Sequence, residues 1–415
     1  MAVTSSETDD VRSTAEAVAR RSYGKLVAFL AARTRDVAAA EDALAEAFAK
    51  ALEDWPRHGC PANPEGWLMT VARRKAIDAM RRQSRETADE QLQAIAEDLA
   101  AAHTEELPDR RLALLFACAH PAIDRAMHAP LMLQVVLGLD AKLISGAFLM
   151  SPAAMSKRLV RAKEKIRQAG IPFRIPGRDE LAGRLETVLD GIYAAFSEGW
   201  ADAGGSDAAR RELSGEALFL GRLVTELLPE EPEALGLVAL MLYVEARRGA
   251  RRNGQGEYVP LADQDPALWD WQMIEEAESA LRKASAMGRV GRYQLEAALQ
   301  SAHVSRRRTG RSNWEEVVQL YDALLALTES PVVAMNRAVA LAEIRGAGAG
   351  LDALEQAACD RQLREYQPYW AARAELLART GAYAEACQAY EMAIGLERDA
   401  SVRRFLQQRQ SALEK

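Results

Sequence analysis

Residues 151–168 carry six lysine or arginine side chains against one glutamate, in a chain whose formal net charge is −7. Such side chains could bind an anion, because they donate hydrogen bonds to phosphate oxygens and to guanine edges. Read as a helix, the segment divides into two faces. One stripe contains Met155, Leu159, Ala162 and Ile166, and another contains Ala154, Arg158, Arg161 and Lys165. The pattern predicts a helix that packs on one side and offers the other to a negatively charged partner.

The neighbouring residues indicate how this helix is positioned. Ser151 is a good N-cap, and Pro152 occupies the first helical position, where its missing N–H costs nothing. Upstream, residues 139–150 predict a short helix from Ala141 to about Phe148. Two short helices joined by a tight turn, the second one basic, form a helix-turn-helix. The alternative is an ordinary amphipathic surface helix with a solvated charged face.

A second basic segment lies at residues 65–83. Its five positive charges within ten residues are Arg73, Arg74, Lys75, Arg81 and Arg82. Its apolar side would comprise Trp67, Val71, Ile77 and Met80. We assign Trp67 to the core rather than to base stacking. Because the chain is acidic overall, any contact with nucleic acid must be made by local basic patches of this kind.

The segment before this patch, residues 36–55, predicts an acidic helix. Its packing face would hold Leu44, Phe48, Ala51 and Leu52, and its other face Asp42, Glu46 and Lys50. Residues 56–64 contain three prolines and a glycine, which would stop both helices. Unstacked bases could be held at such a loop. A simple interhelical connection is the alternative.

An acidic connection follows at residues 84–109, with eight acidic residues and one arginine. Phosphates would repel this segment, so we do not expect it to face DNA. It separates the two basic modules by a span suited to reading two DNA elements.

Composition narrows the class of protein further. The chain has 415 residues, 49% of them hydrophobic and 27% charged, which predicts a globular protein of two to four domains. Its most apolar run, residues 129–139, is too short to cross a bilayer, and the first residues lead into no signal-like apolar region. We therefore expect a cytoplasmic protein.

We expect neither an enzyme nor a cofactor or metal centre. Cys118, His120 and His128 could seed a metal site, but buried helix packing is the preferred interpretation. A second candidate combines two carboxylates with a serine, at Asp190, Ser197 and Glu198. No histidine lies near them in sequence, and aromatic residues at this helical spacing are usually core.

The order of acidic helix, Pro-rich loop, basic helix, linker and helix-turn-helix resembles the extracytoplasmic-function sigma factors of bacterial RNA polymerase. The likeness is carried by AEDALAEAF with ALEDWP, by PANPEGWLMTVARRKAIDAMRR, and by LDAKLISGAFLMSPAAMSKRLVRAKEKIR. The resemblance implies an all-α fold with sigma region 2 at residues 12–84, an acidic linker at 85–109 and a region 4 helix-turn-helix at 110–170. One departure is Ala45, where the family often has glutamine.

The resemblance also implies roles for single residues. Region 2 would bind the clamp coiled coil of core RNA polymerase through Asp42, Glu46 and Phe48. It would hold the separated strand of the −10 element with Asn63, Arg73, Arg74, Lys75 and Arg81. Region 4, which would also meet the polymerase flap, would contact the −35 element through Ala154, Ser156, Lys157, Arg158 and Arg161. Contacts to phosphates or solvent would be made by Lys163, Lys165 and Arg167. The linker would thread the RNA exit path.

More than half of the chain, residues 178–415, forms a helical extension after a break at residues 171–177. A short hairpin is expected around 253–259, followed by a capped helix from Pro266. TPR-like (tetratricopeptide-like) repeats are expected from about 290 to 415, with helices at 314–327 and 330–346. Motif positions of that repeat are occupied by Trp370, Gly381, Tyr383, Ala386, Tyr390 and Ala393, although Arg373 and Leu377 depart from it.

The motifs DGIYAAFSEGW, LADQDPALWD, GRYQLEAALQSAH and SPVVAMNRAVALAE resemble one group of these sigma factors, which ends in TPR-like repeats. In that group the extension is regarded as a built-in controller. The resemblance therefore implies a regulatory domain that could bind a peptide or protein ligand, or dock on the sigma domains.

Together these features predict a sigma subunit that binds core polymerase, recognises the −10 and −35 promoter elements and starts transcription by binding energy alone. The alternative is a helix-turn-helix regulator with a TPR-like sensor domain, which would bind operators without polymerase. The resemblance of the region 2 helix disfavours that alternative.

Overall fold

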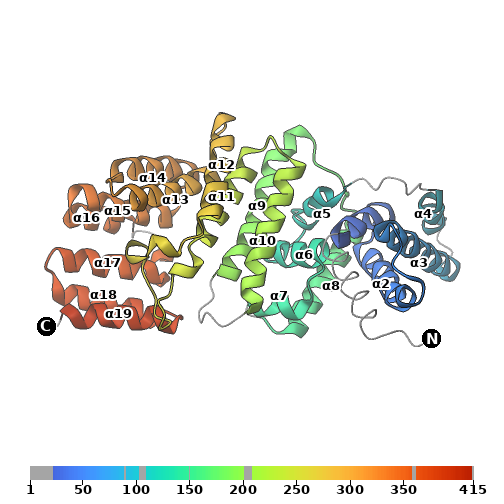
Figure 1. Cartoon of the computed structure of the whole chain (residues 1–415), viewed down its shortest axis with the longest axis horizontal. Coiled ribbons are helices and arrows are strands. Elements are labelled where there is room, and N and C mark those ends of the chain that lie inside the picture. The colour runs from blue at the N-terminus through green and yellow to red at the C-terminus, as the bar shows by residue number, and fades with distance from the viewer. Residues whose placement is uncertain are drawn as a thin grey trace. The chain divides into compact units, whose positions relative to one another are not determined.

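The structure is a computed structural model that describes residues 22–87, 90–101, 109–148, 150–200, 208–357 and 361–413. Regular secondary structure in these ranges is helical, with one isolated antiparallel bridge between Arg252 and Tyr258, so the predicted all-α fold is confirmed (Figure 1). No described helix is long and apolar enough to cross a membrane. The chain divides into two compact units, of which the first comprises the residues up to Gly199 together with Ala209–Leu220.

The first unit begins with a helix at residues 22–34, followed by α2 (Val37–His58), α3 (Pro64–Thr87) and α4 (Glu90–Ala101). The carboxylate of Asp36 caps α2 by accepting a hydrogen bond from Ala39 N at 3.1 Å. α3 packs against α2 on one side and against α4 on the other. The core that these helices share includes Ala43, Ile77, Met80, Ala96 and Leu99.

α4 lies within the predicted acidic linker, so part of that segment is a helix packed on α3. Its buried side chains, Ala96 and Leu99, are apolar, and Glu97 between them is exposed. Residues 88–89 and 102–108 of the predicted linker lie outside the described residues, as do residues 12–21 of the predicted region 2.

The prediction that prolines stop both helices around residues 56–64 is wrong at Pro56. This proline lies in the last turn of α2, which continues to His58. Gly59, with a φ of 83°, then ends the helix and donates its N–H to Trp55 O at 2.9 Å. Pro64 begins α3, where its missing N–H costs nothing.

Four further helices complete the next part of the first unit: α5 (Arg111–Cys118), α6 (Arg125–Leu137), α7 (Ala141–Ala147) and α8 (Pro152–Gln168). The predicted short helix from Ala141 is thus present. α8 packs against α7, α6 and α2. Gly138 ends α6 in the left-handed conformation, with a φ of 75°.

α9 (Arg178–Trp200) follows the predicted break and packs against the helices before it. Arg184 Nη2 donates to Phe116 O at the end of α5 at 2.7 Å, and Arg125 of α6 forms an ion pair with Asp190. A Cβ atom at Gly191 would lie 3.1 Å from Met132 Cε, so the two helices approach closely. The extension therefore begins with a helix that belongs to the first unit.

In the second unit, α11 (Pro232–Glu245) lies against α12 (Trp271–Ala286) and α13 (Arg292–Thr309). The Glu233 carboxylate caps α13 from this neighbouring helix by accepting hydrogen bonds from Tyr293 N at 2.9 Å and Gln294 N at 3.1 Å. A Cβ at Gly236 would lie 2.7 Å from Gln294 N. Only glycine allows this approach of the two backbones.

Six helices follow in sequence: α14 (Trp314–Thr328), α15 (Pro331–Arg345), α16 (Ala347–Ala357), α17 (Gln367–Arg379), α18 (Tyr383–Leu396) and α19 (Ala400–Leu413). Each packs on the next, and Figure 1 shows α17, α18 and α19 side by side. The predicted helices at 314–327 and 330–346 are present as α14 and α15. Between α17 and α18, Gly381 turns the chain with a φ of 84°.

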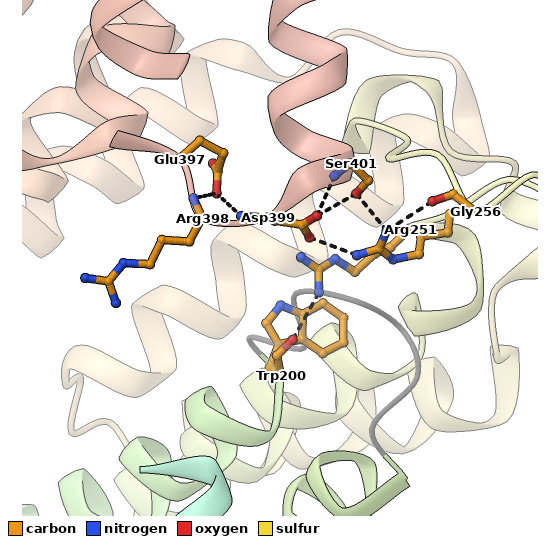
Figure 2. Close-up of polar contacts among 8 residues, drawn as sticks. Trp200, Arg251, Gly256, Glu397, Arg398, Asp399 and Ser401 are labelled. Carbon is orange, nitrogen blue, oxygen red and sulfur yellow. Dashed lines mark hydrogen bonds and ion pairs between the residues drawn. The ribbon is translucent and has the colours of Figure 1, made fainter. Parts of the chain in front are cut away.

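The predicted hairpin around residues 253–259 is present. Val259 N donates to Arg251 O at 2.8 Å, and Asn253 N donates to Glu257 O at 3.0 Å. The hairpin contacts the start of α19, because Arg252 Nη2 lies 2.8 Å from Asp399 Oδ2. Figure 2 shows Asp399 and Ser401 near Gly256 of the hairpin. The capped helix expected from Pro266 begins later. Pro266–Leu268 form a 3-10 turn, and α12 begins at Trp271 with Asp270 as its N-cap.

Candidate nucleic-acid interface

α3 carries its cations on the side away from the core. Its buried side chains are Leu68, Met69, Ala72, Ala76, Ile77 and Met80. Among the predicted contacts to the −10 element, Arg74, Lys75 and Arg81 are exposed and Arg73 is half-buried. Trp67 is half-buried and meets the ring of Trp55 edge-on, with centroids 5.6 Å apart. The separation of packing and cationic faces that the sequence predicts is therefore present, and Trp67 lies with the core.

One of these cations contacts the neighbouring acidic helix. Lys75 Nζ lies 2.8 Å from Glu46 Oε2, with the side chains 46% and 59% exposed. Exposed ion pairs of this kind contribute less than about 1 kcal/mol. Both side chains could therefore exchange this contact for one with another molecule at little cost.

Asn63 has a local structural role. Its Oδ1 accepts a hydrogen bond from Gly66 N at 2.9 Å, which caps the first turn of α3. The side chain is exposed, and Nδ2 has no hydrogen-bond partner among the described residues. A contact with a base would therefore use the amide nitrogen while the oxygen keeps the helix capped.

The acidic ridge, defined here as Asp42, Ala45 and Glu46 of α2, is exposed. Phe48 beside it is half-buried. The prediction that Leu52 belongs to the packing face is wrong, because this side chain is 50% exposed. The buried stripe of α2 instead runs through Val37, Ala40, Leu44, Ala47, Ala51 and Trp55. Leu52 lies beside that stripe, on the side of the acidic ridge.

α8 has the two faces that its sequence predicts. The four residues of the predicted apolar stripe, Met155, Leu159, Ala162 and Ile166, are all buried. Ser151 Oγ accepts a hydrogen bond from Ala154 N at 3.2 Å, so the predicted N-cap is confirmed. Ala154 is half-buried, and the other predicted −35 contacts are exposed: Ser156, Lys157, Arg158 and Arg161. The helix is held by its apolar side and leaves its cations accessible.

α7, which precedes α8, begins at Asp140, whose carboxylate accepts a hydrogen bond from Leu143 N at 2.7 Å. α7 and α8 pack against each other. Leu149, in the connection between them, lies outside the described residues.

The prediction that Lys163 serves phosphate or solvent is wrong. Its Nζ lies 2.7 Å from Glu41 Oε2 of α2, and both side chains are only 13% exposed. The hydroxyl of Tyr23 donates to Glu41 Oε1 at 3.4 Å. Burial raises the pKa of Glu41 and Lys163 opposes that rise, while burial and then Glu41 raise the pKa of Tyr23. These three groups join α8 to α2 and to the first described helix.

Arg167 is accessible to solvent, as expected, and it also forms ion pairs. Its Nη2 lies 2.6 Å from Glu164 Oε1, and its Nε lies 3.8 Å from Asp36 Oδ2. The side chain is 49% exposed. Lys165 is exposed, as expected.

Sequence reasoning missed the pairing of Glu41 and Lys163. A signal was available, because each residue directly follows a buried alanine of an apolar stripe, at Ala40 and Ala162. A charged residue next to such a stripe is drawn to the edge of the core and needs a partner there. Helical periodicity alone does not predict which residue forms the ion pair with such a side chain.

The residues weighed for metal binding are buried or have local hydrogen bonds. Cys118 is fully buried in α5, and burial raises the pKa of its thiol. His128 Nε2 lies 3.1 Å from Ile123 O, and His120 Nδ1 accepts from Ala122 N at 3.1 Å. In the described part of the chain, no cluster of three or more His, Cys, Asp or Glu side chains could hold a metal ion.

Comparisons with known proteins give two family matches. Sigma-70 region 2 matches residues 18–86, which include the acidic ridge and the basic face of α3, and a family of unknown function (DUF6596) matches residues 184–285. The uncharacterized protein R00370 of Rhizobium meliloti (strain 1021) is 40% identical over 377 residues, which cover 88% of each chain. No solved structure matches the chain significantly.

Proposed function

The chain belongs to the same family as the Rhizobium meliloti protein R00370 and carries a sigma-70 region 2, and on this basis we propose that it is an extracytoplasmic-function sigma factor. It would act in the cytoplasm, bind core RNA polymerase, recognise the −10 and −35 elements and start transcription. The sigma-70 region 2 supports a role in transcription initiation. The observation that carries the proposal is the match of this region to the helices that expose an acidic ridge and a basic face side by side.

The acidic ridge of α2 would bind the clamp coiled coil of the polymerase through Asp42 and Glu46, with Phe48 at its edge. The exposure of both carboxylates supports this role. Leu52, 50% exposed beside the ridge, would add apolar area to the contact.

The basic face of α3 would hold the separated strand of the −10 element. Arg74, Lys75 and Arg81 are exposed and point away from a continuous buried stripe, which supports contact with phosphates. Arg73 and Asn63 would add contacts at the N-terminal half of the helix. Because the apolar side of α3 is packed between α2 and α4, the cations have a rigid base.

Region 4, proposed for residues 110–170, would meet the polymerase flap and place α8 in the major groove of the −35 element. The exposed Ser156, Lys157, Arg158 and Arg161, with half-buried Ala154, lie in the first three turns of α8. Recognition helices place their N-terminal residues against base edges. The Ser151 cap and the buried stripe hold the N-terminal end of α8 in place, which supports its contact with DNA.

The extension would regulate the sigma domains and form a TPR-like repeat domain with a groove for a peptide or protein ligand. Two contacts support coupling to region 4: the ion pair between Arg125 and Asp190, and the hydrogen bond from Arg184 to Phe116 O. Both join α9, which opens the extension, to α5 and α6.

Reconstituted transcription tests the proposal. The full chain is mixed with core polymerase from its source bacterium and with genomic DNA, and the 5′ ends of the transcripts are sequenced. We expect new start sites preceded by two shared sequence boxes. A variant with Asp42→Lys and Glu46→Lys should lose them, whereas Asp352→Lys, on the exposed side of α16, should keep them.

Two outcomes would contradict the proposal. Absence of new start sites with the wild-type chain would exclude a sigma factor. Sequence-specific binding of duplex DNA by the chain alone, without any effect on core polymerase, would favour the operator-binding regulator.

A further inference from the structure

Arg247, at the end of α11 in the second unit, is a buried cation with neutral partners. Its side chain is 9% exposed. Nε donates to Tyr243 O at 3.1 Å, and Nη2 donates to Gln300 Oε1 at 2.5 Å. Nη1 has no hydrogen-bond partner in the described part of the chain. A buried guanidinium without a countercharge is costly, because neither acceptor replaces the solvation of the charge.

The group next to Arg247 along the chain is also cationic. Arg251 Nη1 donates to Trp200 O at 3.1 Å, and its guanidinium lies 4.5 Å from the centre of the Trp200 ring (Figure 2). Its other guanidinium nitrogens have no acceptor among the described residues. Burial, and then Arg251, lower the pKa of Arg247 to about 10. The guanidinium groups of Arg247 and Arg251 are therefore near each other, and both are partly shielded from water.

α13 adds a third donor. His303 lies one turn after Gln300, the partner of Arg247, and its Nδ1 accepts a hydrogen bond from Arg306 Nη2 at 2.9 Å. The hydrogen of the neutral ring is therefore on Nε2, which has no acceptor in the described ranges. Burial, then Arg306 and Arg247, lower the pKa of His303 to about 4, so the ring stays neutral.

Two carboxylates form ion pairs with the neighbouring arginines of the same segment. Glu245 Oε1 lies 2.6 Å from Arg248 Nε, and Asp399 Oδ2 lies 2.8 Å from Arg252 Nη2. No ion pair of Arg247 or Arg251 occurs among the described residues. Among the four arginines of the RRGARR segment, residues 247–252, Arg248 and Arg252 thus form ion pairs, and Arg247 and Arg251 form none within the described residues.

We propose that Arg247, Arg251 and His303 bind a small oxyanion, a carboxylate or phosphate group, in the second unit. A guanidinium donates charge-assisted hydrogen bonds to either group, and Nη1 of Arg247 is the nitrogen that has no other partner among the described residues. Because Arg247 is so nearly buried, only a small ligand can reach it. The site lies outside the sigma-70 region 2 match, and its existence does not depend on the proposed role in transcription.

Anion-dependent stability of the full chain is the test. Thermal unfolding is followed in sodium chloride, in inorganic phosphate and in sodium acetate, at one pH and one ionic strength. Phosphate or acetate should raise the midpoint above its value in chloride, and by more in the wild type than in Arg247→Met, since a ligand that binds only the folded state stabilises it. The anion that gives the lower Kd in titration calorimetry identifies phosphate or carboxylate as the preferred group.

Arg247→Met separates binding from structure. This variant should bind the preferred anion with a Kd at least ten-fold higher. Its midpoint of thermal unfolding in chloride should equal or exceed that of the wild type, because an unpaired buried charge has been removed. Arg252→Met is the matched control. It breaks the pair with Asp399, so it should lower the midpoint in chloride but keep the wild-type Kd for the anion.

The proposal is wrong if phosphate and acetate stabilise the wild type no more than chloride does. It is also wrong if Arg247→Met keeps the wild-type anion affinity. If that variant does not fold, Arg251→Gln is tested instead. A several-fold higher Kd for the preferred anion supports the site, and an unchanged Kd overturns the proposal.

Discussion

Lys163 Nζ of α8 lies 2.7 Å from Glu41 Oε2 of α2, and 13% of each side chain is exposed. The pair adjoins both proposed binding surfaces, because Glu41 precedes Asp42 of the acidic ridge and Lys163 follows the exposed cations of α8. Tyr23 donates a further hydrogen bond to the carboxylate. Such a pair is costly to break from one side, since the remaining charge stays at the edge of the core.

We expect Lys163→Met to destabilise the first unit by about 2–3 kcal/mol, because Glu41 would lose its countercharge. The free energy of unfolding, from urea denaturation of the full chain, is the measurement. The double variant with Glu41→Met should recover part of the loss. Lys165→Met, at an exposed position of the same helix, should change stability by less than about 0.5 kcal/mol. Equal effects of the two lysine substitutions would show that the ion pair is unimportant.

The charge on α8 should govern binding to duplex promoter DNA. Arg158→Glu and Arg161→Glu should each weaken −35 recognition by the holoenzyme, since both side chains are exposed on the face away from the core. Each of the corresponding alanine substitutions, if it removes one phosphate contact, should lower the slope of log K against log salt by about 1. Fluorescence anisotropy on labelled promoter fragments measures both quantities.

Affinity of these α8 variants for core polymerase should stay at the wild-type value. An unchanged promoter affinity in both charge-reversal variants would exclude this face of α8 from DNA recognition.

The second unit should lose stability as pH falls from about 6.5 towards about 4. The folded state holds the pKa of His303 at about 4, through burial and then Arg306 and Arg247, below the ordinary value of 6.5. The unfolded chain therefore binds a proton before the folded chain does. Stability from this group is fully present above pH 6.5 and is lost as pH falls through the folded pKa, by at most about 3 kcal/mol.

Urea denaturation at several pH values measures this effect. His303→Asn, which keeps an acceptor for Arg306, should remove that part of the pH dependence. His58→Asn, at the exposed end of α2, should leave the profile as it is. A wild-type profile in His303→Asn would contradict the prediction.

Gly236→Ala should destabilise the second unit by about 1–3 kcal/mol, because the new Cβ would lie 2.7 Å from the backbone nitrogen of Gln294. Gly395→Ala is the matched control. A Cβ there meets nothing within 4 Å, so alanine should stabilise α18 by up to about 1 kcal/mol. Thermal and urea unfolding of both variants check the opposite signs, and a neutral Gly236→Ala would show that α11 and α13 can move apart.

Local patterns in the sequence predicted much of the fold. The apolar stripe of α8, its Ser151 cap and the hairpin near residue 253 are each set by a few neighbouring residues, and each is present. Leu52 and Pro56 were misjudged for different reasons. Leu52 is apolar but lies beside the packing stripe, which only the contacts of α2 define. Pro56 is tolerated in the helix because it lies in the last turn.

In the candidate site, too, features set by local sequence could be predicted and features set by tertiary contacts could not. Exposure of Arg74, Arg81, Arg158 and Arg161 follows from helical periodicity, so it could be predicted. Partners could not. Arg252 finds Asp399 far along the chain, whereas Arg251, its neighbour, finds the Trp200 ring. The sequence does not distinguish the four arginines of this short segment, because only the tertiary structure determines which of them contact a carboxylate.

The contact of the hairpin with the start of α19 has a consequence for how the second unit comes apart. In an open stack of helices the last one has a single neighbour and frays first. Here Arg252 holds both Asp399 and Ser401, and Tyr258 meets the ring of Phe405 edge-on. α19 therefore has neighbours on two sides, and its amides should exchange hydrogen together with those of the hairpin rather than ahead of them.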